Sequence, residues 1–414
     1  MKVWHTHSEA KMINKDKIRM KDKEANHQLR VYSDITQLIA NPQNPTPLVR
    51  LNRINPNKDF QIYLKLERYN PFGSVKDRIV YQMLTALGTN GKTVVEPSSG
   101  NTGIALACVA NALGIPVEIV VPEKIPDEKK VMLRFLGAEV READDALCPL
   151  FPTEGARGLV NALIKSPATK ERYISPNQYE NELNVQAHYQ TTGPEIWQQT
   201  QGEINYFFAG FGTCGTITGV GRYLKEQNAD IKIIAVEPSS PNHKLPGMKR
   251  ITGLDKEFIP KILDSSVIDD TVEVSDKDAY STAIMLARKD GIPVGPTTGA
   301  ILYAALHYAK SNRGLAVVIS PDDAFKYASF YKGVLEAESE DISGQEYDLS
   351  EFICPLSNVK VIEIIENMAE GETARIILGN ADSLKSVAQE LKTRRIKPTF
   401  EQEGEDRFIL AFTK

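Results

Sequence analysis

Short apolar runs alternate with helical segments from about residue 33 to residue 335, and this alternation limits the possible folds more than any other feature of the chain. One example is the run at 93–97 (TVVEP), followed by a helical stretch at 101–114 and a second run at 117–122 (VEIVVP). Strands that alternate with helices build parallel sheets covered by helices. We therefore expect an α/β fold, and the length of 414 residues suggests two or three compact units.

The stretch at 101–114 carries the signals of a helix that ends at a known place. Its apolar residues recur with the spacing of one helix face, at Ile104, Ala105, Cys108, Val109 and Leu113. The sequence Gly114-Ile115-Pro116 then ends the helix, because glycine favours the terminal left-handed turn and proline cannot continue the helix. Cys108 is therefore expected to be a small core residue.

The two ends of the chain differ in composition from its centre. Residues 1–32 are rich in charged and amide side chains, so we expect a flexible leader in which the histidines are solvated. The apolar pattern lapses again over 336–345, an acidic stretch that is typical of a linker. Residues 346–414 follow the order strand, helix, strand, helix and a hairpin turning at Gly404, which predicts a small α/β sandwich after a larger domain at 33–335.

The charge balance and the cysteines argue against several classes of protein. A net charge of −5 disfavours nucleic acid or an anionic membrane as the main partner. No apolar run is long enough to span a bilayer, and the first residues lack the apolar core of a signal peptide. The four cysteines lack the paired spacing of a zinc site or a disulfide scaffold. We therefore expect a cytoplasmic protein without a bound metal.

Two stretches rich in glycine and hydroxyl groups are candidate anion sites. In GFGTCGTITGVG, at 210–221, glycines allow close backbone approach and a following helix presents free N–H groups, which suits a phosphate. The stretch is neither a Walker loop nor a dinucleotide fingerprint, so taken alone it is weak. In EPSSGNTG, the residues Ser98, Ser99, Asn101 and Thr102 offer more donors than a helix cap requires, which favours a carboxylate site.

Lys76 lies in a third stretch, NPFGSVKDR, and taken alone it would be an ordinary surface charge. Together the three stretches resemble fold-type II pyridoxal-phosphate enzymes, the cysteine synthase and cystathionine β-synthase family. NPTPLVRL, KLERYNPFGSVKDR, EPSSGNTGIALA, QAHYQTTGPEIW, GFGTCGTITGVG, VGPTTGA and PDDAFKY occur in the family's order over about 300 residues. The resemblance implies a two-lobed fold like that of the tryptophan synthase β subunit, with the smaller lobe at roughly 80–190, and a homodimer.

The resemblance also assigns site residues. Lys76 would form the Schiff base with pyridoxal 5'-phosphate and later act as the base that removes the substrate α-proton. Asn101 would contact the ring hydroxyl. The phosphate cradle would consist of Gly212, Thr213, Cys214, Gly215 and Thr216, with Cys214 as a small packing residue. The substrate carboxylate would be held by Ser98, Ser99, Thr102 and Gln178.

Thr297 is our choice for the residue that meets the ring nitrogen, by resemblance to a serine in the family's turn at that place, and Thr298 is the alternative. A neutral hydroxyl there leaves the pyridine largely unprotonated, which favours β-elimination chemistry over transamination or racemisation. We therefore expect β-replacement, in which L-cysteine is made from an activated serine and a sulfur donor.

The choice of activated serine depends on cations. O-Phosphoserine carries a dianion that must meet positive charge, whereas O-acetylserine does not. The segment NHKLPGMKRITG offers His243, Lys244, Lys249 and Arg250, and it resembles a stretch found in phosphoserine-using archaeal relatives. Lys249 and Arg250 are therefore predicted to bind the substrate, with O-phosphoserine favoured and O-acetylserine next.

The C-terminal unit resembles the TusA (SirA-like) sulfur-carrier family, through YDLSEFICPL and MAEGE. Cys354 precedes a helix opened by Pro355, where the helix N-terminus stabilises a thiolate, so the resemblance implies a persulfide on Cys354 and a sulfur-donor protein as partner. A buried structural cysteine is the alternative. Ser357 replaces the second proline of the family's CPxP motif, and Cys148, in a second Cys-Pro-Leu sequence, is a weaker candidate for a sulfur acceptor.

Three other functions remain open at this stage. The first two are condensation with homocysteine, as in cystathionine β-synthase, and a serine or threonine dehydratase. The third, of a different class, is a sulfur-trafficking or regulatory binding protein that keeps the fold without the chemistry. Intact Lys76 and Asn101 weigh against this last function.

Overall fold

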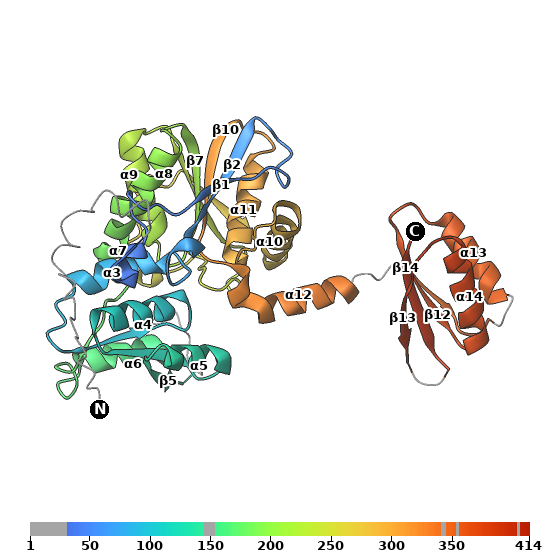
Figure 1. Ribbon diagram of the computed structural model, residues 1–414, viewed down its shortest axis with the longest axis horizontal. Coiled ribbons are helices and arrows are strands. Elements are labelled where there is room, and N and C mark those ends of the chain that lie inside the picture. Colours follow the sequence, from blue (N-terminus) through green and yellow to red (C-terminus); the bar gives the residue numbers. More distant parts are fainter. Residues whose placement is uncertain (1–30, 145–153, 341–344, 353–355, 404–405) are drawn as a thin grey trace, which may run out of the picture. The chain divides into compact units, whose positions relative to one another are not determined.

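The structure is a computed structural model, and it describes residues 31–144, 154–340, 345–352, 356–403 and 406–414. The chain divides into two compact units, the first ending at Lys326 and the second running from Tyr327 to Lys414. Figure 1 shows both units, each built of strands and helices. The expected α/β architecture is confirmed in each unit.

A six-stranded sheet forms the larger part of the first unit. Its strands lie in the order β1-β2-β10-β7-β8-β9, and all neighbours are parallel except β1 and β2. The bounds are β1 (Leu48–Arg50), β2 (Phe60–Leu66), β7 (Ile204–Gly210), β8 (Lys232–Pro238), β9 (Asp270–Val274) and β10 (Gly314–Ser320). The helices α10 (Asp276–Asp290) and α11 (Pro296–Tyr308) lie on one side of the sheet, with α8 (Gly193–Gln199) and α9 (Gly215–Gln227) on the other (Figure 1). This cover explains why the strands read as continuous apolar runs.

A second, fully parallel sheet follows the order β5-β4-β3-β6. Its bounds are β3 (Thr93–Pro97), β4 (Val117–Pro122), β5 (Glu139–Ala143) and β6 (Tyr173–Ile174). Val94 and Ile119 pack into the core that includes α3 (Lys76–Ala86), α4 (Asn101–Leu113) and α5 (Asp127–Phe135), whereas Val95 and Val120 pack against α6 (Gly155–Lys165) on the opposite face. These elements fall within the segment where the sequence predicted the smaller lobe.

The helix α4 begins and ends as predicted. Gly114 is its C-cap, with a φ of 68°, in the left-handed region that glycine tolerates. Cys108 is only half-buried, because it packs at the margin of the core. The remaining short elements are η1 (Ile35–Leu38), η2 (Glu67–Tyr69), α7 (Glu182–Ala187), the π-helical turn η3 (His188–Thr192), η4 (Lys256–Phe258), η5 (Ser265–Val267) and η6 (Ala324–Tyr327).

The second unit has its own mixed sheet, in the order β11-β12-β14-β13. The order of elements after residue 345 agrees with the sequence prediction. The bounds are α12 (Ala328–Glu340), β11 (Gln345–Leu349), α13 (Leu356–Asn367), β12 (Thr373–Leu378), α14 (Ala381–Thr393), β13 (Thr399–Gln402) and β14 (Phe408–Thr413). Ile376, Leu378 and Leu410 of the sheet join Val361 and Val387 of the two long helices in one core. Gly404, where the hairpin was predicted to turn, lies outside the described residues.

The segment between the units differs from its sequence prediction. We expected the larger domain to end at 335 and an irregular linker over 336–345, but α12 continues through Glu340 and belongs to the second unit. Alanine and glutamate are strong helix formers, so an acidic stretch that lacks an apolar face can still be helical. None of the described helices is both long and apolar enough to cross a membrane.

Candidate active site

Lys76 is the first residue of α3, directly behind a turn. Gly73 in that turn has a φ of 79°, and the backbone N–H of Val75 donates to the carbonyl of Pro321 over 2.9 Å, which ties the turn to the end of β10. Burial lowers the pKa of Lys76, although Asp322 and Asp77 oppose the shift. A lowered pKa makes the neutral, nucleophilic amine more available, as Schiff-base chemistry requires.

Four buried charges hold the start of α3 in place. The Arg78 guanidinium pairs with Glu67 at 2.6 Å and with Glu195 at 2.5 Å, and Lys65 pairs with the same Glu195 at 2.7 Å. Their side chains are at most 1% exposed. Burial alone would raise the pKa of Glu67, but the Arg78 charge lowers it to about 2, so the carboxylate stays ionised. Because Arg78 lies two residues after Lys76, this network fixes the position of the lysine.

The predicted phosphate cradle lies between the end of β7 and the start of α9. A Cβ atom at Gly212 would lie 2.7 Å from the carbonyl oxygen of Gly247, and a Cβ atom at Gly215 would collide with the side chain of Asn184. Only glycine fits either position. The bare backbone at the N-terminus of α9 is the arrangement that binds a phosphate through N–H groups.

Asn184 was not singled out from the sequence, although it packs against this cradle. The residue is fully buried, and its amide N–H groups donate to the carbonyl of Gln178 at 2.7 Å and to the Thr213 hydroxyl at 3.1 Å. Its Oδ1 atom has no hydrogen-bond partner among the described residues. A buried acceptor of this kind provides a place for a donor of a bound molecule or water. The sequence offered only a weak signal, an amide between the two apolar residues Leu183 and Val185 of α7.

The side chains of Cys214 and Thr216, the other two in the cradle, bring no charge to a bound phosphate. Burial raises the pKa of Cys214 to about 12, so its thiol is neutral and fills space, as the sequence predicted. The Thr216 hydroxyl lies 3.1 Å from Nε2 of His188, and burial lowers the pKa of His188 to about 3. Backbone N–H groups, and not side-chain charge, are therefore what this loop offers an anion.

The predicted carboxylate loop connects β3 to α4. Ser98 Oγ accepts the N–H of Gly103 at 3.0 Å, so this hydroxyl caps the helix. Thr102 donates to Oε1 of Gln178 at 2.9 Å, and both side chains are buried. The structure thus brings together Thr102 and Gln178, which lie far apart in the sequence. Ser99 is only half-buried, and its hydroxyl makes none of these contacts.

Asn101, the first residue of α4, is held by two residues of the PDDAFKY motif. Its Nδ2 atom donates to Oδ2 of Asp322 at 2.6 Å, and its Oδ1 atom accepts from Nζ of Lys326 at 3.0 Å. Neither partner had a role predicted from the sequence. Asp322 also acts on the pKa of Lys76, so it lies close to the predicted Schiff-base lysine.

Of the two threonines in the VGPTTGA turn, Thr297 is the more accessible. Its hydroxyl donates to the carbonyl of Pro246 at 3.0 Å, whereas Thr298 is fully buried and shares a hydrogen bond of 3.1 Å with Ser320. Thr297 therefore remains our choice for the ring nitrogen.

The PGMKR segment lies against the phosphate cradle, but its two cations face different neighbours. Lys249 Nζ lies 5.1 Å from the ring centroid of Tyr179, and the guanidinium of Arg157 on α6 lies 4.9 Å from the same centroid. Arg250 instead contacts the Ser239 carbonyl and pairs with Glu273 at 2.7 Å. The structure therefore brings Lys249 to Tyr179, together with Arg157, which the sequence did not indicate, and it does not bring Arg250 there.

Comparisons with known proteins agree with this geometry. The chain belongs to the pyridoxal-phosphate dependent enzyme family, whose model matches residues 39–322. It is 41% identical to a cysteine synthase of Aquifex aeolicus over 306 residues, covering 71% of this chain and 90% of the relative. It is 37% identical to cystathionine beta-synthase of Apis mellifera over 380 residues, covering 85% of this chain and 74% of the relative. The solved structure of cysteine synthase (OASS) of Entamoeba histolytica shares 30% sequence identity with this chain and has a TM-score of 0.65. The match covers 75% of this chain and 93% of that structure.

Within the family, the protein is an enzyme of the cysteine synthase type and uses pyridoxal 5'-phosphate. The residues fit this cofactor. Lys76 offers an amine with a lowered pKa, and the backbone at Gly212 and Gly215 leaves room that no other residue type would leave. The described residues hold no cluster of His, Cys, Asp and Glu suited to a metal ion.

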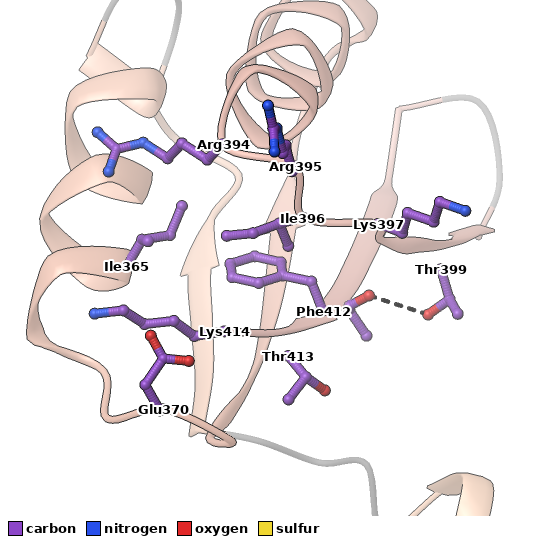
Figure 2. Close-up of a pocket in the computed structure, with 11 residues that line it drawn as sticks. Ile365, Glu370, Arg394, Arg395, Ile396, Lys397, Thr399, Phe412, Thr413 and Lys414 are labelled. Carbon is purple, nitrogen blue, oxygen red and sulfur yellow. Dashed lines mark hydrogen bonds between the residues drawn. The ribbon is translucent and has the colours of Figure 1, made fainter.

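The second unit carries a pocket that Figure 2 shows at the C-terminal ends of α13 and α14. Ile365, Ile396 and Phe412 meet at its centre. Arg394 pairs with Glu390 at 2.7 Å, and Lys414 Nζ donates to the carbonyl of Met368 at 2.8 Å. Cations at helix C-termini complement the helix dipole, which accounts for these contacts without a ligand.

The opposite end of α13 lies next to the predicted sulfur-carrier cysteine. Cys354 itself, like Cys148, lies outside the described residues. Ser357, in place of the family's second proline, is fully buried and donates to Ser383 at 3.1 Å, and Ser383 donates to the Phe352 carbonyl at 3.3 Å. The helix therefore begins without the second proline, at Leu356.

Proposed function

We propose that this enzyme makes L-cysteine from O-phosphoserine and a sulfur donor. The supporting observation is the pair of cations at Tyr179, Lys249 and Arg157, which come from two different segments and lie beside the residue that follows Gln178. A dianionic leaving group needs positive charge that the neutral acetyl group of O-acetylserine does not need.

The chain's own residues would divide the reaction between them. Pyridoxal 5'-phosphate, held by Lys76 until the substrate amine displaces the lysine, would supply the electron sink that makes the substrate α-proton acidic. The Nζ atom of Lys76, once released, would take that proton and return it at the end. Thr102 and Gln178 would hold the substrate carboxylate. The bond between Cβ and the phosphate oxygen breaks as phosphate leaves toward Lys249 and Arg157, and a bond between Cβ and sulfur replaces it.

The preferred substrate can be tested with two matched variants. Charged hydrogen bonds contribute roughly 1.5–3 kcal/mol, so Lys249→Met should raise the KM for O-phosphoserine about 10- to 100-fold. The KM for O-acetylserine should change little. Arg250→Met serves as the control, because Arg250 pairs with Glu273, and its KM values should stay close to those of the unmodified enzyme. Equal losses with both substrates, or better turnover of O-acetylserine by the unmodified enzyme, would refute the proposal.

The role of Lys76 has a direct test. Lys76→Ala should abolish both turnover and the visible absorbance band of the cofactor bound to the protein. A protein that keeps the band and full activity would exclude Lys76 as the Schiff-base residue. The same spectrum, recorded on the unmodified protein, provides the reference band for this comparison.

We further propose that the second unit is a TusA-like sulfur carrier that loads Cys354 with a persulfide supplied by a donor protein. The outer sulfur would attack the substrate Cβ as phosphate leaves, giving a product joined to Cys354 by a disulfide. A small thiol would then reduce that bond, releasing L-cysteine and the Cys354 thiol. The order of elements after residue 345 and the buried Ser357–Ser383 contact beside the start of α13 support the proposal.

Cys354→Ser tests this relay. Turnover with free sulfide should be unchanged, and turnover with a persulfide-bearing donor protein plus a small thiol should be lost. Unchanged turnover with both donors would exclude the relay. A homodimer, as in the family, is part of the proposal and can be checked by light scattering.

A further inference from the structure

Lys326 connects the two loops that carry the proposed cofactor contacts. Its Nζ atom donates to the carbonyl of Gly73 at 2.8 Å, in the turn before Lys76, and to Oδ1 of Asn101 at 3.0 Å. A Cβ atom at Gly73 would lie 3.3 Å from Nζ, so the glycine leaves room for the ammonium group. Lys326 thus joins segments that are more than twenty residues apart in the sequence.

The charge of Lys326 acts on the buried carboxyl group of Asp77. Asp77 is buried beside Lys76 and accepts the N–H of Phe72 at 2.7 Å. Burial raises the pKa of Asp77 to about 7, and the nearby Lys326 charge works in the opposite direction. An ammonium group in this position therefore favours the ionised form of Asp77 next to the Schiff-base lysine.

The hydrogen-bond partners of Asn101 identify which atom of its side-chain amide is the oxygen and which is the nitrogen. An ammonium group can only donate a hydrogen bond, so the atom facing Lys326 must be the amide oxygen. A carboxylate can only accept, so the atom facing Asp322, 2.6 Å away, must be the amide nitrogen. The nitrogen carries two N–H groups, and only one is directed at Asp322. Since no other acceptor for this nitrogen is found among the described residues, its second N–H is left for an acceptor such as the ring oxygen of the cofactor.

We propose that Lys326 is a positioning residue that fixes the amide of Asn101 so that an N–H group faces the cofactor ring oxygen. This inference rests on the proposed role of Asn101. Without Lys326, the amide oxygen loses its donor, and the side chain is held at one end only. The positive charge beside the cofactor is lost as well, and a nearby cation disfavours protonation of the nitrogen that links the lysine to the cofactor.

The test compares three full-length variants of the cofactor-loaded enzyme. Lys326→Met removes the donor and the charge but keeps most of the stem, Lys326→Arg keeps both, and Lys310→Met is a matched control at an exposed position. The measurements are the dissociation constant of the cofactor, the position of its visible absorbance band and the pH titration of that band. The far-ultraviolet circular dichroism of each variant reports folding.

Lys326→Met should weaken cofactor binding about 10-fold, the loss expected for one charged hydrogen bond. Its band should move and titrate at higher pH. Lys326→Arg should restore the band and its titration toward those of the unmodified enzyme, and Lys310→Met should change neither. In an Asn101→Ala background, the loss of cofactor affinity caused by Lys326→Met should disappear, because the amide through which it acts is gone, whereas the change in titration that follows from the lost charge should remain.

Two results would overturn the inference. One is an Lys326→Met enzyme with unchanged affinity, band and titration. The other is an equal loss of cofactor affinity when Lys326→Met is made in the Asn101→Ala background. If Lys326→Met does not fold, an unshifted band in Lys326→Gln, which keeps a donor but not the charge, would equally refute the role of the charge. Failure of the Lys76 assignment is distinguishable, because it would leave the band present in Lys76→Ala.

Discussion

The loop before α4 and the loop before α9 stand at equivalent places, each after a parallel strand, but they present different chemistry. The α4 loop offers side chains, since Ser98 caps the helix and Thr102 bonds to Gln178. The α9 loop offers backbone, since Gly212 and Gly215 leave no room for a Cβ atom. A phosphate with several oxygens is suited to an array of N–H groups, whereas an amino-acid carboxylate is suited to hydroxyl and amide groups placed one by one.

Replacing one glycine by alanine in each loop should show most clearly that the α9 loop binds through its backbone and the α4 loop through its side chains. Gly215→Ala places a Cβ atom against Asn184, so cofactor affinity should fall about 100-fold or more, for an overpacking cost of about 3 kcal/mol. Gly100→Ala is the control, because a Cβ atom there meets nothing within 4 Å. Cofactor titration followed by absorbance measures both. Similar losses in the two variants would show that the loops do not differ in this way.

A smaller effect is expected when the α4 loop loses one hydroxyl. Thr102→Val leaves the buried Oε1 atom of Gln178 without its donor, which should cost about 1–3 kcal/mol. The KM for the activated serine should rise while cofactor affinity stays unchanged, and Thr102→Ser should restore the KM. Kinetics and cofactor titration on the same samples provide the test. A loss of cofactor affinity in Thr102→Val would contradict the division of labour between the loops.

The smallest effect should follow from changing the thiol inside the cradle. Cys214→Ala should alter cofactor affinity by no more than about threefold, because backbone N–H groups make the contacts. Since the pKa of Cys214 is about 12, its thiol should also resist alkylation in the folded protein near neutral pH. Peptide mass spectrometry after treatment with iodoacetamide, with and without urea, checks this. Rapid alkylation of the folded enzyme would show that the thiol is exposed and ionised.

The sequence predicted the loops better than it predicted the partners of their side chains. The glycines, the hydroxyls and the lysine are visible as local patterns, because each answers a local requirement of turn geometry or helix capping. The family resemblance assigned Thr102 and Gln178 to the same substrate carboxylate, and the structure brings these two side chains together. The role of Lys326 was not predicted, since its partner Asn101 lies more than two hundred residues away and no spacing rule connects them.

The cations near Tyr179 show the same limit. Lys249 and Arg250 were grouped because both lie in the basic segment that resembles a stretch of phosphoserine-using relatives, but their side chains contact different neighbours. Only Lys249 faces Tyr179, and the second cation comes from Arg157 on α6. A pair formed across the fold leaves no pattern in a single sequence.

The four buried charges around Arg78 have a consequence for how such enzymes diverge. Lys65, Glu67 and Arg78 are encoded close together, but Glu195 lies more than a hundred residues further on. Replacing any one of them with a neutral residue would leave a buried charge without its partner. The protein interior solvates charge poorly, so the free energy of unfolding should fall by about 3–5 kcal/mol. Neutral drift at these positions should therefore require simultaneous replacements, and homologous chains should keep or lose the four as a set.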